Sequence, residues 1–406
     1  MKNKFAIGFA SLLFSGFAGA QGLYYMGTEA QESMPLKWTV GADLTYDDNV
    51  APGYGSKEDS LSINPYVGLS FVSITPQTTW DVYARLGAIY YFDQPDAPGA
   101  DDTYAQARAG INMTHRFSDR LRISSRNFLS YELEPDYSYG FASTRQMGEY
   151  FYWQTDNSVG YRWTDRLATY TGFQLTGLDY DDVPNADRFT YTLYNQFRYL
   201  LGPQDVLTAE YRYGHTDADG VAPDSESHYI LVGIEHRFNP SSVMIARAGA
   251  QISETDGGDS NTTPFVELAV NTQVNTQFQV RGFLRYSVEP YDTVQVVGNS
   301  HYNFDERKTL RIGVSGNYAL SESLSLYGGV DYIPTSFEDG RLVSGSGPSS
   351  TSDRDENLVN AYVGVSMKFT DYLTGSLTYN FTNSDSDFDN RDYDRNRVTV
   401  GVHAEF

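Results

Sequence analysis

Apolar and polar side chains alternate along the last ten residues of the chain, 397–406. Successive side chains of a strand point to opposite faces, so the apolar residues share one face and the polar residues share the other. A final strand with a lipid face, a polar lumen face and a terminal aromatic is typical of a membrane barrel, although a half-buried soluble strand alternates in the same way. We interpret the apolar face as the signal that a barrel-insertion machinery reads. It consists of Val398, Val400, Val402, Ala404 and Phe406.

Other segments alternate in the same way. In residues 359–369 the odd positions are apolar, and residues 278–287 and 230–237 also separate into an apolar and a polar face. Aromatic residues such as Trp163 and Phe369 fall beside short turns, and others such as Tyr90 and Phe92 fall near long loops. Two aromatic levels are expected at the two interfaces of an outer membrane, so the apolar faces are predicted to contact lipid. Residues 167–176 have no clear phase.

Short turns recur about every 40 residues and separate pairs of strands that are joined by longer acidic loops. The turns are predicted at 75–77, 118–120, 164–166, 202–204, 239–241, 275–276, 321–323 and 370–372. Together with a leading and a closing hairpin they predict an all-β fold: a transmembrane, up-and-down antiparallel β-barrel of about 18 strands, of the outer-membrane type, over residues 36–406. A repeat of this period could also suggest a propeller, but each propeller blade would need four short strands.

The first twenty residues predict export. Lys2 and Lys4 precede an uncharged apolar run from Phe5 to Phe17, and Ala18-Gly19-Ala20 resembles a cleavage site. Residues 1–20 are therefore predicted to be a cleaved signal peptide, because the run is too short to span a bilayer as a helix. Residues 21–35 are interpreted as a periplasmic lead-in to the barrel. The predicted location is the outer membrane of a Gram-negative-type bacterium.

Composition narrows the class further. The mean hydropathy is negative, although the chain has 33 Tyr and 23 Phe, which fits strands with one lipid face and one wet face. The chain has no cysteine, so disulfides, thiolate metal sites and cysteine nucleophiles are excluded. The formal charge is -23, and loss of the two signal-peptide lysines makes it -25. A chain this acidic is not expected to bind nucleic acid.

The N-terminal strands carry a resemblance. Residues 44–50, Leu-Thr-Tyr-Asp-Asp-Asn-Val, are followed by an acidic, polar gap and then by residues 59–69, with a proline at position 65. This pattern resembles the opening of the putative beta-barrel porin 2 family. The resemblance implies an outer-membrane barrel, and some members of that family lie in exopolysaccharide export operons. It implies no defined substrate and no catalytic residues.

Arginines recur on the predicted inner faces at about mid-height. They are Arg85, Arg108, Arg126, Arg212, Arg247, Arg281, Arg285 and Arg311. Guanidinium groups around a water-filled pore would concentrate anions, and arginine suits contact with carboxylate, sulfate or phosphate groups. The structural alternative is that these arginines pair with Asp81, Glu210, Glu235 and Glu267 and brace the wall.

The acid excess lies mostly in the predicted loops. Residues 385–394 have the alternating carboxylates of a calcium loop, but the twelfth position is Asn396, so a solvated acidic loop that shares cations with lipopolysaccharide is favoured over a metal site. His215 with Asp217 and Asp219 is a loop-side cluster of the kind that a barrel protease would need. No serine and histidine pairing is evident, and no enzyme activity or cofactor is predicted.

These features predict a porin-like channel for passive diffusion of small hydrophilic solutes, with anions among the candidate solutes. Residues 337–356, rich in Gly and Ser, are the expected infolded constriction. Two alternatives remain: a barrel for exopolysaccharide export or assembly, whose inward aromatics stack on sugars, and a structural or adhesive barrel. The aromatics concerned are Tyr83, Tyr91, Phe128, Tyr194, Phe283 and Tyr362. Expected partners are outer-membrane lipid and lipopolysaccharide, the insertion machinery and the solutes or a polysaccharide. A homotrimer is left open.

Overall fold

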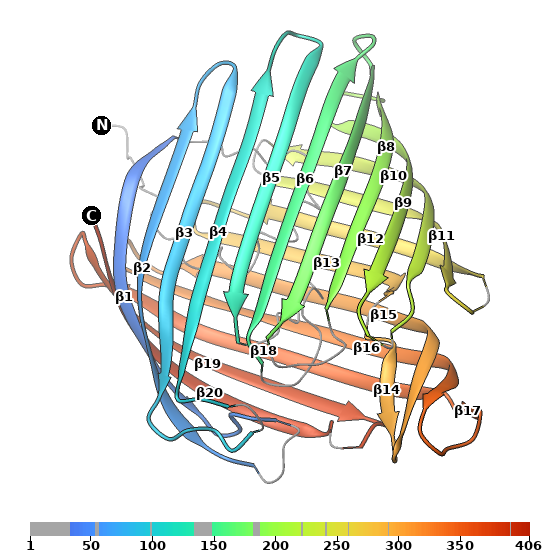
Figure 1. The fold of residues 1–406 in the computed structure, drawn as a ribbon. Coiled ribbons are helices and arrows are strands. Elements are labelled where there is room, and N and C mark those ends of the chain that lie inside the picture. Colours follow the sequence, from blue (N-terminus) through green and yellow to red (C-terminus); the bar gives the residue numbers. More distant parts are fainter. Residues whose placement is uncertain are drawn as a thin grey trace.

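The described part of the chain is one antiparallel sheet that closes on itself (Figure 1). The computed structural model describes residues 33–52, 57–97, 100–133, 148–181, 187–220, 222–239, 242–258, 260–290, 292–389 and 391–406. The predicted signal peptide and most of the predicted lead-in lie outside these residues, and β1 begins at Met34. Within the described residues, no helix has the length and apolar character needed to cross a membrane.

Eighteen of the twenty strands in the described residues form the wall. They are β1 (Met34–Asp47), β2 (Ser60–Ile74), β3 (Thr78–Tyr91), β4 (Thr103–Arg116), β5 (Leu121–Glu132), β6 (Tyr150–Arg162), β7 (Leu167–Tyr180), β8 (Arg188–Leu200), β9 (Asp205–Ala218), β10 (Ser225–Asn239), β11 (Ser242–Thr255), β12 (Asn261–Gln273), β13 (Phe278–Val288), β15 (Ser300–Ala319), β16 (Leu324–Ser344), β18 (Arg354–Lys368), β19 (Leu373–Ser386) and β20 (Tyr393–Glu405). The other two, β14 (Val294–Val297) and β17 (Ser350–Thr351), are short strands within loops.

Each wall strand pairs with the next along the chain, and β20 pairs back onto β1 to close the barrel. In this closing pair Thr39 lies opposite Glu405, and Asp47 lies opposite Arg397. Closure leaves no open sheet edge, which is what a membrane-spanning sheet requires. The predicted up-and-down, outer-membrane-type barrel and its eighteen strands are confirmed.

The short turns are stabilised by the same kind of side-chain to backbone hydrogen bond. The side-chain oxygen of the first turn residue accepts a hydrogen bond from the backbone N–H three residues later, as Ser118 does from Leu121 at 3.1 Å. Thr370 does the same for Leu373 at 3.0 Å. Ser, Thr and Asn at this position satisfy the backbone of a tight turn. The turns and both ends of the described chain lie at one end of the barrel, the turn end; the longer connections lie at the other, the loop end (Figure 1).

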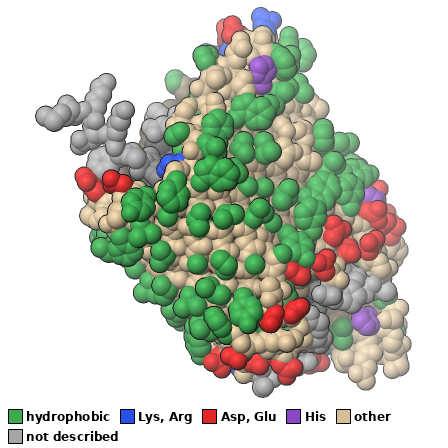
Figure 2. Space-filling view, turned by 60° about the vertical axis from the view of Figure 1, so that its left-hand side comes forward, with side chains coloured by type: hydrophobic (Ala, Val, Ile, Leu, Met, Phe, Trp, Pro, Cys, Tyr) green, Lys and Arg blue, Asp and Glu red, His purple; other side chains and the backbone are tan. Residues whose placement is uncertain are grey.

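Side chains alternate between the two faces of the wall. Apolar residues such as Val232 and Val363 point outward and are exposed, while residues such as Glu267 and Arg311 point inward and are buried. Figure 2 shows hydrophobic side chains spread over one outer face, with acidic side chains gathered toward its lower edge. Aromatic residues are exposed at both ends of the apolar band, for example Phe369 beside a turn and Phe92 beside a loop. The two predicted aromatic levels are present.

The expected constriction at residues 337–356 is not an infolded loop. Phe337 to Ser344 continue β16, which pairs with the long β15 and extends the wall beyond the other strands. Above the barrel this extension is held by an apolar cluster of Tyr302, Phe304, Phe337 and Phe388. Phe304, Phe337 and Phe388 pack edge to face, and together with the pairing onto β15 this packing holds the extension of β16 in the wall.

Candidate functional site: the barrel lumen

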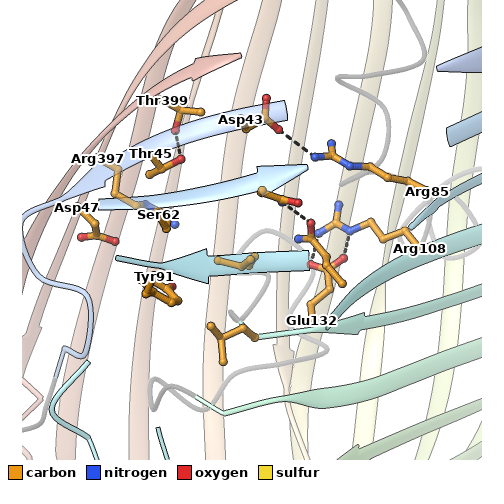
Figure 3. A pocket seen from close by; sticks show the side chains of 14 residues that line it. Asp43, Thr45, Asp47, Ser62, Arg85, Tyr91, Arg108, Glu132, Arg397 and Thr399 are labelled. Carbon is orange, nitrogen blue, oxygen red and sulfur yellow. Dashed lines mark hydrogen bonds and ion pairs between the residues drawn. The ribbon is translucent and has the colours of Figure 1, made fainter. Parts of the chain in front are cut away.

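A polar cavity of about 310 Å³ lies against the inner wall where β20 and β1 to β5 meet (Figure 3). Its lining consists of Asp43, Thr45, Asp47, Ser62, Asn64, Arg85, Ile89, Tyr91, Gln106, Arg108, Glu132, Leu133, Arg397 and Thr399. Every strand of this arc contributes inward-facing residues, because the pleat turns alternate side chains toward the lumen. The lining therefore combines hydrogen-bond donors and acceptors with both signs of charge.

Charged groups of the cavity are paired between strands, Arg85 of β3 with Asp43 of β1 and Arg108 of β4 with Glu132 of β5. Arg85 donates from Nη2 to Asp43 Oδ2 at 2.9 Å, and its guanidinium lies 3.6 Å from the centre of the Tyr66 ring. Arg108 binds both carboxylate oxygens of Glu132. Planar guanidinium groups held in this way have fixed orientations, and the wall they line is rigid and polar.

The loop end of the cavity is closed by apolar residues. Val50, Tyr91, Tyr104 and Leu133 form a buried cluster that joins the connections after β1, β3 and β5. This cluster ties three connections together over the cavity. The cavity is thus reached from the lumen and is bounded above by a packed, dry wall.

The connection after β13 folds inward at the loop end. Gln251 on β11 exchanges two hydrogen bonds with the backbone of Val288, at 2.7 and 2.9 Å, although β12 lies between the two strands. Farther along, Asp292 lies 3.9 Å from Arg188 on β8. Because β9 to β12 lie between β8 and β13 in the wall, a connection that contacts Arg188 runs across the inner side of the wall at the loop end, so the infolding occurs here.

Glu289 of this infolded segment lies in a buried cluster of charges with arginines of β13 and β15. Glu289 lies 2.8 Å from Arg285, 3.2 Å from Arg307 and 2.7 Å from Arg311. Burial alone would raise the pKa of Glu289, but Arg311 and then Arg307 and Arg285 outweigh it and hold the pKa well below its usual range. With Asp292 and Arg188, four arginines surround the two carboxylates of the infolded segment.

A third cluster of charged side chains, on β8 to β12, braces the wall between the polar cavity and the cluster around Glu289. Glu210 on β9 accepts hydrogen bonds from Arg212 and from Gln196, and lies 3.8 Å from Arg247. Arg247 also donates to Glu267 on β12 at 2.9 Å. The chain of contacts links β8, β9, β11 and β12, so these arginines stiffen the lumen wall.

The eight predicted pore arginines all lie on the lumen side of their strands, but the structure distributes them among different groups. Arg85 and Arg108 line the cavity, Arg285 and Arg311 hold Glu289, and Arg212 and Arg247 brace the wall. The remaining two, Arg126 and Arg281, lie opposite Asp156 and Ser315 in the register of the neighbouring strands.

Three of the four carboxylates named as bracing partners, Glu210, Glu235 and Glu267, do pair with arginine. Sequence reasoning missed Asp43, Glu132 and Glu289 as partners. Asp43 lies on the polar face of β1, so its alternation could have revealed it. Glu132 and Glu289 lie at strand ends beside loops, where alternation gives no signal.

The inward aromatics lie flat against the wall. A side chain placed at Gly110 would meet the Tyr83 ring at 2.4 Å, and one at Gly172 would meet Tyr194 at 2.5 Å. Phe283 covers Gly313 and Tyr362 covers Gly329 in the same way. These rings occupy the space that the glycines leave, while Phe128 and Tyr91 are buried in apolar clusters. Their observed packing is structural.

The other candidate residues have simple environments. Val398, Val400 and Val402 are exposed on the outer face of β20, Ala404 follows on the same face, and the exposed Phe406 is the last residue of the chain.

His215 faces outward, and its partner is Glu226 at 3.6 Å rather than Asp217 or Asp219. In the acidic segment 385–394, Asp387 accepts a backbone hydrogen bond from Asp355, and Asp394 pairs with Lys57. Asn390 lies outside the described residues.

No protein-family model matches this chain, and neither does any curated protein. The family resemblance noted in the N-terminal strands is therefore not confirmed. Among solved structures the chain is similar to Acinetobacter baumannii OccAB4, with 14% identity, a TM-score of 0.45, and coverage of 93% of this chain and 100% of that one. It is also similar to Acinetobacter baumannii OccAB3, with 12% identity, a TM-score of 0.47 and coverage of 91% and 99%. The outer membrane protein OpdK from Pseudomonas aeruginosa gives 13% identity, a TM-score of 0.45 and coverage of 91% and 99%.

Proposed function

We propose that this barrel is a passive channel of the outer membrane for small hydrophilic solutes. The observation that carries the proposal is the polar cavity between β20 and β5, where guanidinium, carboxylate, amide and hydroxyl groups face the lumen. Such a lining exchanges hydrogen bonds with a polar solute, and its apolar residues Ile89, Tyr91 and Leu133 lie toward the loop end. Fixed ion pairs keep the side chains out of the path.

A preference for anions would come from the loop end. The wall strands β8, β13 and β15 place four arginines around Glu289 and Asp292 of the infolded segment, so a solute that passes them meets an excess of positive charge. The cavity below contains three arginines and three carboxylates and adds little net charge. We therefore expect a modest anion preference, set by the arginines around Glu289 and Asp292.

The test is conductance of the purified mature protein in planar bilayers under a salt gradient. Ohmic steps with a reversal potential on the anion side are expected. Arg285→Gln should move the permeability ratio toward cations, whereas Arg120→Gln at an exposed turn should leave it unchanged. Silence from protein that is folded, as shown by heat-modifiable migration, would overturn the channel proposal and would favour the polysaccharide or structural alternative.

A further inference from the structure

A group of uncharged polar side chains lies on the outer face of the barrel, where the other strands present apolar residues. The group, called here the outer polar patch, consists of Ser125, Asn127, Thr155, Asn157, Thr171 and Asn195 on β5 to β8. Asn127 and Thr171 are exposed, and the other four are half-buried. Their outward direction follows from their register with exposed apolar neighbours, since Asn127 lies opposite Ile111, and Asn157 lies opposite Phe173.

The outer polar patch lies at the middle of the apolar band. On β5 it is flanked along the strand by Ile123 toward the turn end and by Leu129 toward the loop end. On β8, Asn195 lies between the exposed Leu193 and Phe197. A strand that is apolar on both sides of a polar residue places that residue at hydrocarbon depth, not at the interface, where polar side chains are ordinary.

The members of the patch are hydrogen-bonded to one another. Thr155 donates to Asn127 at 2.7 Å, and Asn127 donates to Ser125 at 3.1 Å. Asn157 donates to Thr155 at 2.6 Å, and Asn195 donates to Thr171 at 2.5 Å. These contacts use part of the bonding capacity, because the side-chain oxygens of Asn157 and Asn195 accept no hydrogen bond among the described residues.

The chemistry of the patch selects its partner. Acyl chains carry no hydrogen-bonding groups, and the phosphates and sugars of lipid head groups lie at the interface and attract cations, which the patch lacks. A partner at this depth must be embedded in the membrane and must offer both donors and acceptors. A second copy of this chain offers the same uncharged donors and acceptors, so the patch is complementary to itself across a symmetry axis.

We propose that the outer polar patch on β5 to β8 is the surface through which copies of this chain associate in the membrane. Association lets the unused amide and hydroxyl groups bond to their counterparts on the neighbour. Polar and small side chains drive association between membrane segments, because lipid provides no hydrophobic force for it. The interface is therefore distinct from the apolar remainder of the outer wall.

The absence of cysteine makes a direct test available. The near-isosteric Ser125→Cys places one thiol in the patch, and Val363→Cys places one on the exposed outer face of β18 as a matched control. Membranes that contain either full-length variant are treated with a bismaleimide and analysed after boiling. Products at multiples of the protomer mass are expected for Ser125→Cys and not for Val363→Cys. Monomers from both, equal products from both, or a product that contains a different protein would overturn the proposal.

A second variant separates association from folding. Asn157→Leu in the Ser125→Cys background removes amide hydrogen bonds but keeps an outward side chain that lipid accepts. If the patch is an interface, the cross-linked fraction should fall by about threefold for each lost intermolecular hydrogen bond. Heat-modifiable migration should be unchanged, because the barrel closes through backbone pairing. An unchanged cross-linked fraction in the folded variant would contradict the proposed interface.

Discussion

Arg311 holds Glu289 through two hydrogen bonds, from Nε to one carboxylate oxygen at 2.7 Å and from Nη2 to the other at 2.9 Å. Both side chains are buried, and Glu289 follows the last residue of β13 while Arg311 lies on β15. Arg285 and Arg307 approach the same carboxylate. Glu289 therefore compensates three guanidinium groups and fixes the end of β13 to the wall strand beside it.

Glu289→Gln should destabilise the barrel by about 3–5 kcal/mol, because it leaves buried guanidinium groups without their shared counter-charge. The measurement is urea unfolding of the purified barrel, followed by loss of heat-modifiable migration. Glu322→Gln at the exposed turn between β15 and β16 is the control and should change stability by less than about 0.5 kcal/mol. Equal effects of the two substitutions would contradict a central role for Glu289.

The same carboxylate predicts a pH dependence. The pKa of Glu289 is lowered in the folded barrel, so its contribution is fully present above the ordinary Glu pKa of about 4.3 and is lost as the pH falls toward the folded pKa. The stability difference between the native protein and Glu289→Gln should be constant from about pH 7 to pH 5. Below about pH 4.3 it should shrink by up to about 1.4 kcal/mol per pH unit. A stability difference that grows on acidification would contradict a lowered pKa of Glu289.

The wall could be predicted from sequence because alternation, short turns and aromatic levels agree with one another. In the strand over residues 167–176 the inward and outward positions could not be told apart from the sequence, for a physical reason. Thr169 and Thr171 face outward, while Tyr170 faces the lumen, so polarity no longer distinguishes the two sides. The same feature, polar residues on the outer wall, defines the outer polar patch. A pattern of alternation fails where the wall departs from an apolar exterior.

The lumen was harder to predict. Arginine positions follow from strand phase, but their partners depend on which strands are neighbours and on where connections fold. Glu289 is compensated by residues of β13 and β15, and Asp292 reaches Arg188 on the distant β8. The inward bend of this connection has no periodic pattern of residues by which it could be recognised in the sequence. For that reason the constriction was expected in a longer, Gly-rich and Ser-rich segment that instead extends β16.

The pair of Arg108 and Glu132 predicts two opposite changes in ion selectivity. Arg108→Gln leaves the Glu132 carboxylate uncompensated in the cavity and should move the permeability ratio toward cations. Glu132→Gln leaves the guanidinium and should move it toward anions. Reversal potentials in asymmetric salt measure both. Shifts of the same sign, or none in either variant, would show that ions do not sense this cavity.

Gly110→Ala should cost about 1–3 kcal/mol, because the added methyl group would lie 2.4 Å from the Tyr83 ring and would force it off the wall. Gly214 on β9 is a matched control. It also faces the lumen, and a methyl group there would meet its nearest neighbour, Thr192 Oγ1, at 3.5 Å, an ordinary contact. Urea unfolding of both variants should therefore separate them clearly. A Gly110→Ala barrel as stable as the Gly214→Ala barrel would mean that Tyr83 moves at no cost.

Phe406 should matter more for assembly than for the stability of the finished barrel. Its backbone exchanges hydrogen bonds with Trp38 at 2.8 and 3.0 Å and so helps to close the wall, and any residue other than proline can make both bonds. Its side chain is 71% exposed and stacks only on Tyr372, with ring centroids 6.5 Å apart. Phe406→Ala should cost about 0.5–1.5 kcal/mol from the lost ring contact.

Assembly in cells is expected to suffer more from this substitution, because an insertion machinery that reads a terminal aromatic would lose its signal. The two effects are separated by comparing the folded fraction in outer membranes with the folded fraction after refolding into detergent micelles. For Phe406→Ala, the folded fraction in outer membranes should fall several-fold, whereas the folded fraction after refolding into micelles should remain near the native value. Phe117→Ala, which removes an exposed aromatic beside another turn, controls for loss of interfacial contact. If Phe117→Ala lowers the folded fraction in cells as much as Phe406→Ala does, the terminal residue acts as an interfacial anchor and not as an assembly signal.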